Sequence, residues 1–177
     1  ADFAKALPLG VMAHVAAPPI RPSDLVLTSE LVVEGVIVRS ELVDPPPHLP
    51  GGLASDEIWL ELDVSVSHVL AGDAGIADQT VTIVTIAWAG SSGEREAALE
   101  ELSRMVQAGP TGVEVTAFLM RGARGEGYWN PPNGAGMILE DTTGTFWLHP
   151  SEPIEEADAW QDRQAIATEV QNSQGSL

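Results

Sequence analysis

The strongest constraint on the fold comes from residues 58–67, where apolar side chains recur at every second position. The apolar set consists of Ile58, Leu60, Leu62, Val64 and Val66, and the set between them of Trp59, Glu61, Asp63, Ser65 and Ser67. Successive side chains of a β-strand point to opposite faces of the sheet. The pattern therefore predicts a long strand with one buried and one solvated face, and a β-rich domain around it.

Other strands are predicted from β-branched and apolar composition at 31–43, 80–88, 113–120 and 135–149, the last a hairpin turning at Asp141–Gly144. Gly35 lies inside the first of these strands, which predicts a bulge or a close approach of another backbone there. The segments 44–57 and 121–134 are rich in proline and glycine, and both are predicted to be long loops.

One helix is predicted between the third and fourth strands. Ser91 and Glu94 have the spacing of a capping box, and Gly109 with Pro110 ends the segment. Its apolar stripe consists of Ala98, Leu99, Leu102 and Met105. A short helical turn is expected at 23–30.

A C-terminal helix is expected from Ser151, with Pro153 at an early helical position, to about Gln171. Its apolar stripe is poor and consists of Ile154, Trp160 and Val170.

Three strands, a helix and further strands follow one another in the order of an OB-fold. The expected fold class is mainly β: an OB-like barrel of five to six strands, with a helix between strands 3 and 4 and a C-terminal helix. A β-sandwich with one inserted helix is the alternative. The expected organisation is an extended segment at 1–22, a barrel domain at 23–150, and a C-terminal helix or tail at 151–177.

Three segments resemble a known group of proteins: DLVLTSELVVEGVIV at 24–38, VSVSHVLAGD at 64–73 and VTAFLM at 115–120. They look like uncharacterised exported bacterial proteins with an OB-like domain, similar to the netrin module and the tissue inhibitors of metalloproteinases. The chain departs from the group at Ala71, where lysine is frequent before the glycine, and it lacks the N-terminal cysteine of the animal inhibitors. The resemblance implies the fold and export, and it does not imply protease inhibition.

The charge balance excludes several classes of partner. Twenty-six acidic residues oppose eight basic ones, which gives a net charge of −18 at pH 7. Nucleic-acid binding needs a basic footprint that this chain lacks, and anionic membrane surfaces are disfavoured for the same reason. The near absence of lysine, with only Lys5, is typical of proteins from GC-rich bacteria or a salt-adapted organism.

An exported protein is expected, and a cytoplasmic one is the alternative. The chain begins at Ala1 without an initiator methionine, as after removal of a signal peptide, although a trimmed chain would also begin this way. The sequence contains no cysteine, so disulfides and thiolate metal sites are excluded. No apolar run reaches the roughly 18 residues of a membrane span.

The sequence shows no catalytic constellation, and no catalytic residue, metal site or cofactor is predicted. A nucleophile elbow and a phosphate-binding loop are both absent. The four histidines, His14, His48, His68 and His149, are far apart and lack metal-ligand spacing. His68 is in phase with the apolar face of the long strand, so it is expected to be a partly buried histidine with its polar atoms satisfied.

A binding surface is expected at the two long loops, because the loops after the first and fourth strands border the ligand face of an OB-fold. The candidate residues combine aromatic and arginine side chains, which suit a protein or sugar contact. They are Arg121, Arg124, Tyr128, Trp129, Asn130 and His48. The alternative is that Trp129 folds back to cap the barrel.

The expected function is that of a non-enzymatic extracellular protein-binding or assembly module. The partner is another protein or further copies of the chain, held by the terminal segments 1–22 and 153–177. A carbohydrate-binding OB module is the first alternative. A metal-dependent hydrolase that uses the histidines and acids is the second.

Overall fold

The computed structural model describes residues 22–44, 57–88, 90–109, 112–122, 127–131, 136–141, 144–148 and 163–174. Their elements follow in the order α2 (Pro22–Thr28), β1 (Leu31–Val43), β2 (Ile58–Ala71), the 3₁₀ turn η1 (Ala74–Ile76), β3 (Thr80–Trp88), α3 (Arg95–Ala108), β4 (Glu114–Arg121), β5 (Tyr128–Asn130), β6 (Met137–Asp141), β7 (Gly144–Leu148) and α4 (Arg163–Gln174). The expected segment 1–22 lies outside the described residues, apart from Pro22.

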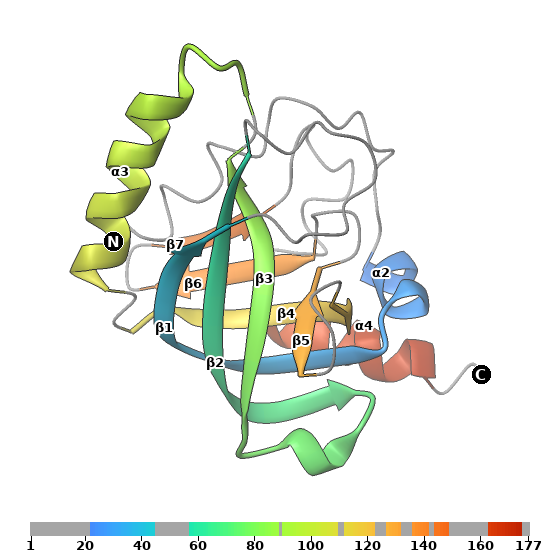
Figure 1. The fold of residues 1–177 in the computed structure, drawn as a ribbon. Coiled ribbons are helices and arrows are strands. Elements are labelled where there is room, and N and C mark those ends of the chain that lie inside the picture. The colour runs from blue at the N-terminus through green and yellow to red at the C-terminus, as the bar shows by residue number, and fades with distance from the viewer. Residues whose placement is uncertain are drawn as a thin grey trace.

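Five strands form a closed barrel in the order β1–β2–β3–β5–β4, and β4 returns to pair with β1. The pairs are antiparallel except for β3 with β5, which run parallel. The hairpin of β6 and β7 extends from β4 and turns at Asp141–Gly144, as the sequence predicts. The predicted fold class is confirmed: a mainly β, OB-like barrel with α3 between β3 and β4 and α4 after the last strand (Figure 1).

At Gly35 the structure has the close backbone approach that the sequence predicts, and it lies opposite a bulge in the neighbouring strand β2. The register shifts between Glu34 and Gly35, and a Cβ atom on Gly35 would lie 2.3 Å from the backbone oxygen of Ser65. Only a residue without a side chain fits this close approach of two backbones.

The same bulge overturns the expectation for His68. Gly35 pairs with Val66 and Glu34 with His68, so Ser67 is an extra residue that shifts the phase of β2 by one position. Val69 therefore takes the inward position and packs against the core. The His68 side chain points outward and is 73% exposed, 3.9 Å from the Glu34 carboxylate.

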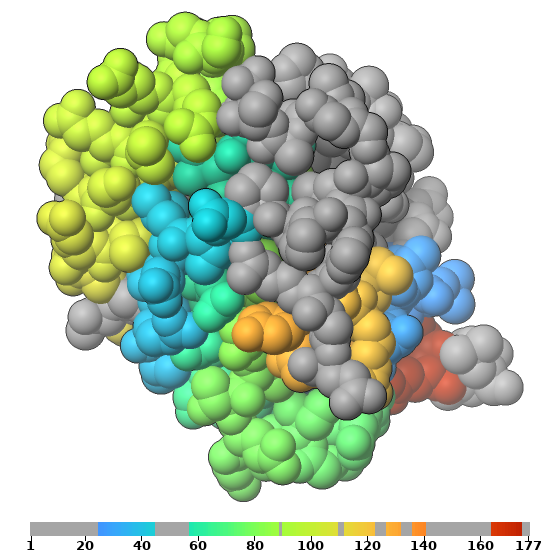
Figure 2. All heavy atoms as spheres, in the orientation of Figure 1, coloured from blue at the N-terminus to red at the C-terminus, as the bar shows by residue number. Residues whose placement is uncertain are grey.

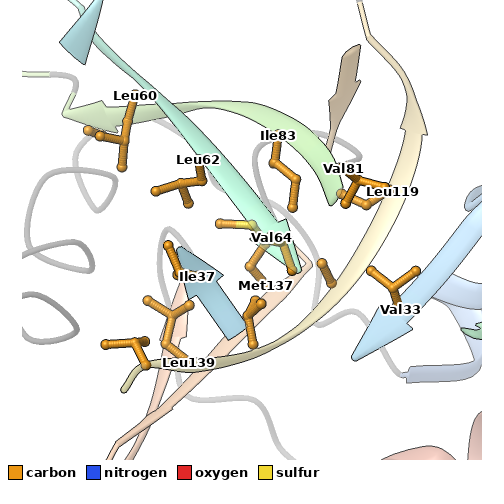
Figure 3. Close-up of a cluster of buried hydrophobic side chains, with 14 of the residues drawn as sticks. Val33, Ile37, Leu60, Leu62, Val64, Val81, Ile83, Leu119, Met137 and Leu139 are labelled. Carbon is orange, nitrogen blue, oxygen red and sulfur yellow. The ribbon is translucent and has the colours of Figure 1, made fainter. Parts of the chain in front are cut away.

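The barrel interior is filled by aliphatic side chains from five strands. Figure 3 shows ten of them converging from β1, β2, β3, β4 and β6: Val33, Ile37, Leu60, Leu62, Val64, Val81, Ile83, Leu119, Met137 and Leu139. Leu102 and Met105 of the predicted helical stripe join this cluster, and Ala98 and Leu99 pack at its margin. The helix α3 thus closes one side of the barrel.

The start and end of α3 follow the sequence signals in part. Gly109 lies directly after its last residue, as predicted. The predicted capping box does not form: the helix begins at Arg95, and the Ser91 hydroxyl donates to the Glu94 carboxylate over 3.0 Å. Glu94 is therefore the N-cap residue and not the third residue of the helix.

A second, smaller cluster lies on the outer surface of the barrel, where α2 and α4 cover β1, β4 and β6. It consists of Leu25, Val26, Val32, Phe118, Ile138, Ile166 and Val170. Ile166 and Val170 are one helical turn apart and form the buried stripe of α4. Ile154 and Trp160 of the expected stripe lie outside the described residues.

We expect Gly35→Ala to lower the free energy of unfolding by about 1–3 kcal/mol, because the added methyl group meets a backbone atom that no rotamer change can move. Urea denaturation measures this loss. Gly93→Ala is the matched control, since no atom lies within 4 Å of a Cβ at that position. Equal stability of the two variants would contradict the close approach.

Candidate functional site

A row of paired residues crosses the outer face of the barrel over four strands. Arg39 of β1 pairs with Asp63 of β2, Asp63 with Thr82 of β3, and Thr82 with Tyr128 of β5. Paired residues of neighbouring strands lie on the same face of a sheet. Tyr128, a residue singled out from the sequence, is therefore placed on this face, where it is half-buried.

Arg39 is held by three carboxylates on this face. Its Nε donates to Asp63 over 2.5 Å, and its two terminal nitrogens donate to Glu61 over 2.6 Å and to Glu41 over 2.5 Å. The Thr82 hydroxyl donates to the other oxygen of Asp63 over 2.8 Å. One guanidinium against three carboxylates leaves this group a net charge of −2.

The network shifts the pKa values of both its central members. Hydrogen bonds to Asp63 and then to Glu61 raise the pKa of Arg39 above its ordinary value. Partial burial raises the pKa of Asp63, but hydrogen bonds from Arg39 and Thr82 act in the opposite direction, and the result is a pKa below the ordinary value. Both groups therefore stay charged over the physiological pH range.

Two exposed valines accompany these charges. Val38 is 56% exposed because it is the extra residue of a second bulge, between Ile37 and Arg39. Val36 lies on the same strand and is 36% exposed. We call the surface formed by Val36, Val38, Arg39, Glu41, Glu61, Asp63 and Thr82 the acidic face.

A pocket of about 460 Å³ adjoins the acidic face, between the end of β1, the start of β2 and the first turns of α3. In Figure 2 the last residues of β1 (cyan) lie beside α3 (yellow-green). The described lining consists of Glu41, Leu42, Val43, Asp44, Glu57, Ile58, Arg95 and Leu99. Glu41 belongs to both the pocket and the acidic face, so the two surfaces are continuous.

Two polar groups at the pocket have distinct environments. The Arg95 Nε atom is buried and has no hydrogen-bond partner in the described part of the chain. Glu57 accepts a hydrogen bond of 3.1 Å from the indole nitrogen of Trp59.

Trp59 itself was expected on the solvated face of its strand, but it is only 7% exposed. Trp59 lies on the outer face of β2, as predicted, and pairs with Ile86 of β3. The predicted exposure of its side chain is wrong.

The prediction of one continuous loop over 121–134 is wrong in the middle of the segment, where Tyr128–Asn130 form the strand β5. This strand pairs with Thr82 and Ile83 on one edge and with Met120 and Arg121 on the other, so it closes the barrel. Three residues flanked by glycine and proline carry no alternation that could reveal a strand.

Of the candidate residues in this segment, the structure brings Arg121 and Trp129 together. Trp129 is half-buried and packs against the barrel core, as the capping alternative describes. The Arg121 guanidinium lies 5.3 Å from the centre of the Trp129 ring and 3.5 Å from the Glu30 carboxylate. Asn130 donates to the Pro131 carbonyl over 3.3 Å. Arg124 and His48 lie outside the described residues, as do positions 45–56 of the other loop.

The Arg39 network was missed by sequence reasoning. The signal was present in the polar positions of two alternating strands, since Glu61 and Asp63 share one face of β2. The sequence does not show the register of β1 against β2. Arg39 and Asp63 are 24 positions apart, and the bulge at Val38 decides which side of the sheet Arg39 faces.

Within the described ranges, no group of three histidine, aspartate or glutamate side chains is arranged to hold a metal ion. No helix in the same part of the chain is long and apolar enough to span a membrane. The chain matches no protein-family model, and no curated protein matches it.

We expect Asp63→Asn to cost about 1 kcal/mol of stability near neutral pH, the size of a partly exposed ion pair. The folded pKa of Asp63 lies below its unfolded value, so its contribution is complete above about pH 4 and is lost as the pH falls through the folded pKa. The stability difference from wild type should therefore disappear in acid. Urea unfolding at a series of pH values measures it, with the exposed Glu101→Gln as control. A stability difference that does not shrink as the pH is lowered would contradict the ion pair.

We expect Trp129→Ala to lower the free energy of unfolding by about 2–4 kcal/mol, because the indole packs against the core. Arg121→Gln should cost at most about 1 kcal/mol, the size of an exposed cation–π contact. Thermal and urea unfolding of both variants compare the two effects. Equal, small losses would show that Trp129 does not support the barrel.

Proposed function

We propose that the protein is a non-catalytic extracellular binding module, and that its protein partner docks on the acidic face. The observation that carries this proposal is the pair of exposed valines, Val36 and Val38, beside a fixed group of charges with Arg39 at its centre. Apolar contact area next to oriented charges is typical of a surface that recognises another protein.

The charges of the acidic face favour a basic partner. The group around Arg39 has a net charge of −2, and the whole chain has one of −18. Charge complementarity accelerates encounter and rejects partners of like charge. Because Arg39 is already held by three carboxylates, the face keeps its geometry when the partner arrives and less ordering entropy is lost.

The position of the acidic face on the barrel also supports the proposal. It covers β1, β2 and β3, and Asp44 and Glu57, the described ends of the connection between the first two strands, line the pocket beside it. In OB-folds this outer surface is the usual ligand face. The extracellular setting is carried over from the resemblance to exported bacterial proteins, and self-assembly through the same face is the other form of this proposal.

The test compares two variants that each replace one exposed apolar residue with an acid. Val38→Asp alters the acidic face, and Leu27→Asp alters the helix α2, outside that face, where Leu27 is 67% exposed. Proteins of the source organism that wild type retains are identified, and their affinity for the purified variants is measured by calorimetry. Val38→Asp should weaken binding at least about tenfold, the equivalent of about 1.4 kcal/mol, and Leu27→Asp should not.

Two results would contradict this proposal. One is a partner that Val38→Asp retains with wild-type affinity. The other is a partner that only Leu27→Asp loses, which would place the binding surface on the α2 side. Light scattering of the purified chain over a range of concentrations identifies self-assembly, which Val38→Asp should then abolish.

A further inference from the structure

We infer that the pocket between β1, β2 and α3 binds a lysine or arginine side chain of the protein partner, together with a backbone carbonyl of the same segment. The inference rests on the proposed function, because it names the part of the partner that the protein recognises. Three features of the described lining carry it: an aliphatic base, an excess of carboxylates and an arginine nitrogen without an acceptor.

The apolar part of the lining suits the stem of a long basic side chain. Leu42, Ile58 and Leu99 contribute aliphatic surface from three different elements. Lysine and arginine bury their methylene groups along such surfaces and keep the charged end in a polar environment. A pocket of about 460 Å³ holds one such side chain with adjoining backbone.

The carboxylates supply the electrostatic attraction. Glu41, Asp44 and Glu57 give the described lining three carboxylates against the one cation Arg95, and Arg39 outside the lining is bonded to Glu41, so Asp44 and Glu57 supply most of the attraction. Glu57 is half-buried and is held in position by the indole of Trp59. A carboxylate accepts several hydrogen bonds, so Glu57 keeps capacity for a cationic donor after binding the indole.

Arg95 requires that the bound segment also carries a hydrogen-bond acceptor. Its Nε atom is buried without a partner in the described part of the chain, and a buried donor without an acceptor is costly. A lysine or arginine side chain has no acceptor and would be repelled by the guanidinium. A peptide carbonyl satisfies this nitrogen without adding charge, and a peptide segment carries it beside the basic side chain. The lining therefore favours a peptide over a free amine.

The probe is hexalysine, acetylated and amidated at its ends, with spermine as the free-amine arm and hexaglutamate as the charge control. Binding to the full chain is followed by fluorescence anisotropy of labelled peptide and by calorimetry for spermine.

Glu57→Gln should weaken hexalysine binding about threefold to tenfold, the range of one charge-assisted hydrogen bond. The amide still accepts from Trp59, so the fold is retained. Glu101→Gln removes the same charge from the exposed surface of α3 and should have a smaller effect.

The variant Arg95→Gln separates the inference from general electrostatics. Removal of a positive charge should tighten the binding of any cation if charge alone acts. The inference requires the opposite for hexalysine, a loss of about threefold to tenfold, because the donor to the peptide carbonyl is shortened and displaced. Spermine has no carbonyl and should bind Arg95→Gln at least as tightly as wild type.

The outcomes distinguish this inference from the proposed function. Hexalysine binding that Arg95→Gln tightens, or that Glu57→Gln and Glu101→Gln change equally, overturns the inference and identifies a generic cation surface. If Val38→Asp loses the natural partner while Glu57→Gln and Arg95→Gln retain it, the pocket is not used and the proposed function stands. If Val38→Asp retains the partner, the proposed function fails whatever the peptide does.

Discussion

The whole barrel depends on the close approach of two backbones at Gly35. This residue pairs with Val66 of β2 on one edge and with Val115 of β4 on the other, so β1 joins both ends of the sheet. Closure needs bent strands, and the extra residue Ser67 of β2, opposite Gly35, bends β2 at this point. The same bulge turns His68 outward and brings Val69 inward. The lack of a side chain at Gly35 lets the two strands approach here, and the bulge opposite it decides which residues of β2 face the core.

The fold was largely predictable because its long elements carry strong local patterns. The alternation from Ile58 to Val66 and the helical stripe ending at Met105 both reflect burial against a single core. The strand β5 was missed for a physical reason. Tyr128 and Trp129 are fixed by parallel pairing to Thr82 and Ile83, which lie far away in the chain. Such non-local hydrogen bonding leaves no period in the sequence.

For the candidate site, the sequence predicted which residue types matter but not where the fold places them. Tyr128 and Trp129 are neighbours in the sequence, yet the strand period sends them to different surroundings: Tyr128 to the outer row and Trp129 against the core. The role of Arg39 depends on a register that a bulge resets within two residues. Composition shows that acids are abundant, whereas only the register shows which three of them hold one arginine.

The state of Asp63 indicates what kind of chemistry the acidic face suits. A carboxylate whose pKa is held low by Arg39 and Thr82 is a weak base, so proton transfer is poorly served by it. Fixed charges of this kind serve recognition, since they need no reorganisation on binding. The net charge of −18 attracts basic molecules at long range, but salt screens that field beyond roughly 8 Å. In the proposed binding, selectivity therefore comes from short-range features such as the exposed Val38 and the Arg95 nitrogen, which has no partner among the described residues.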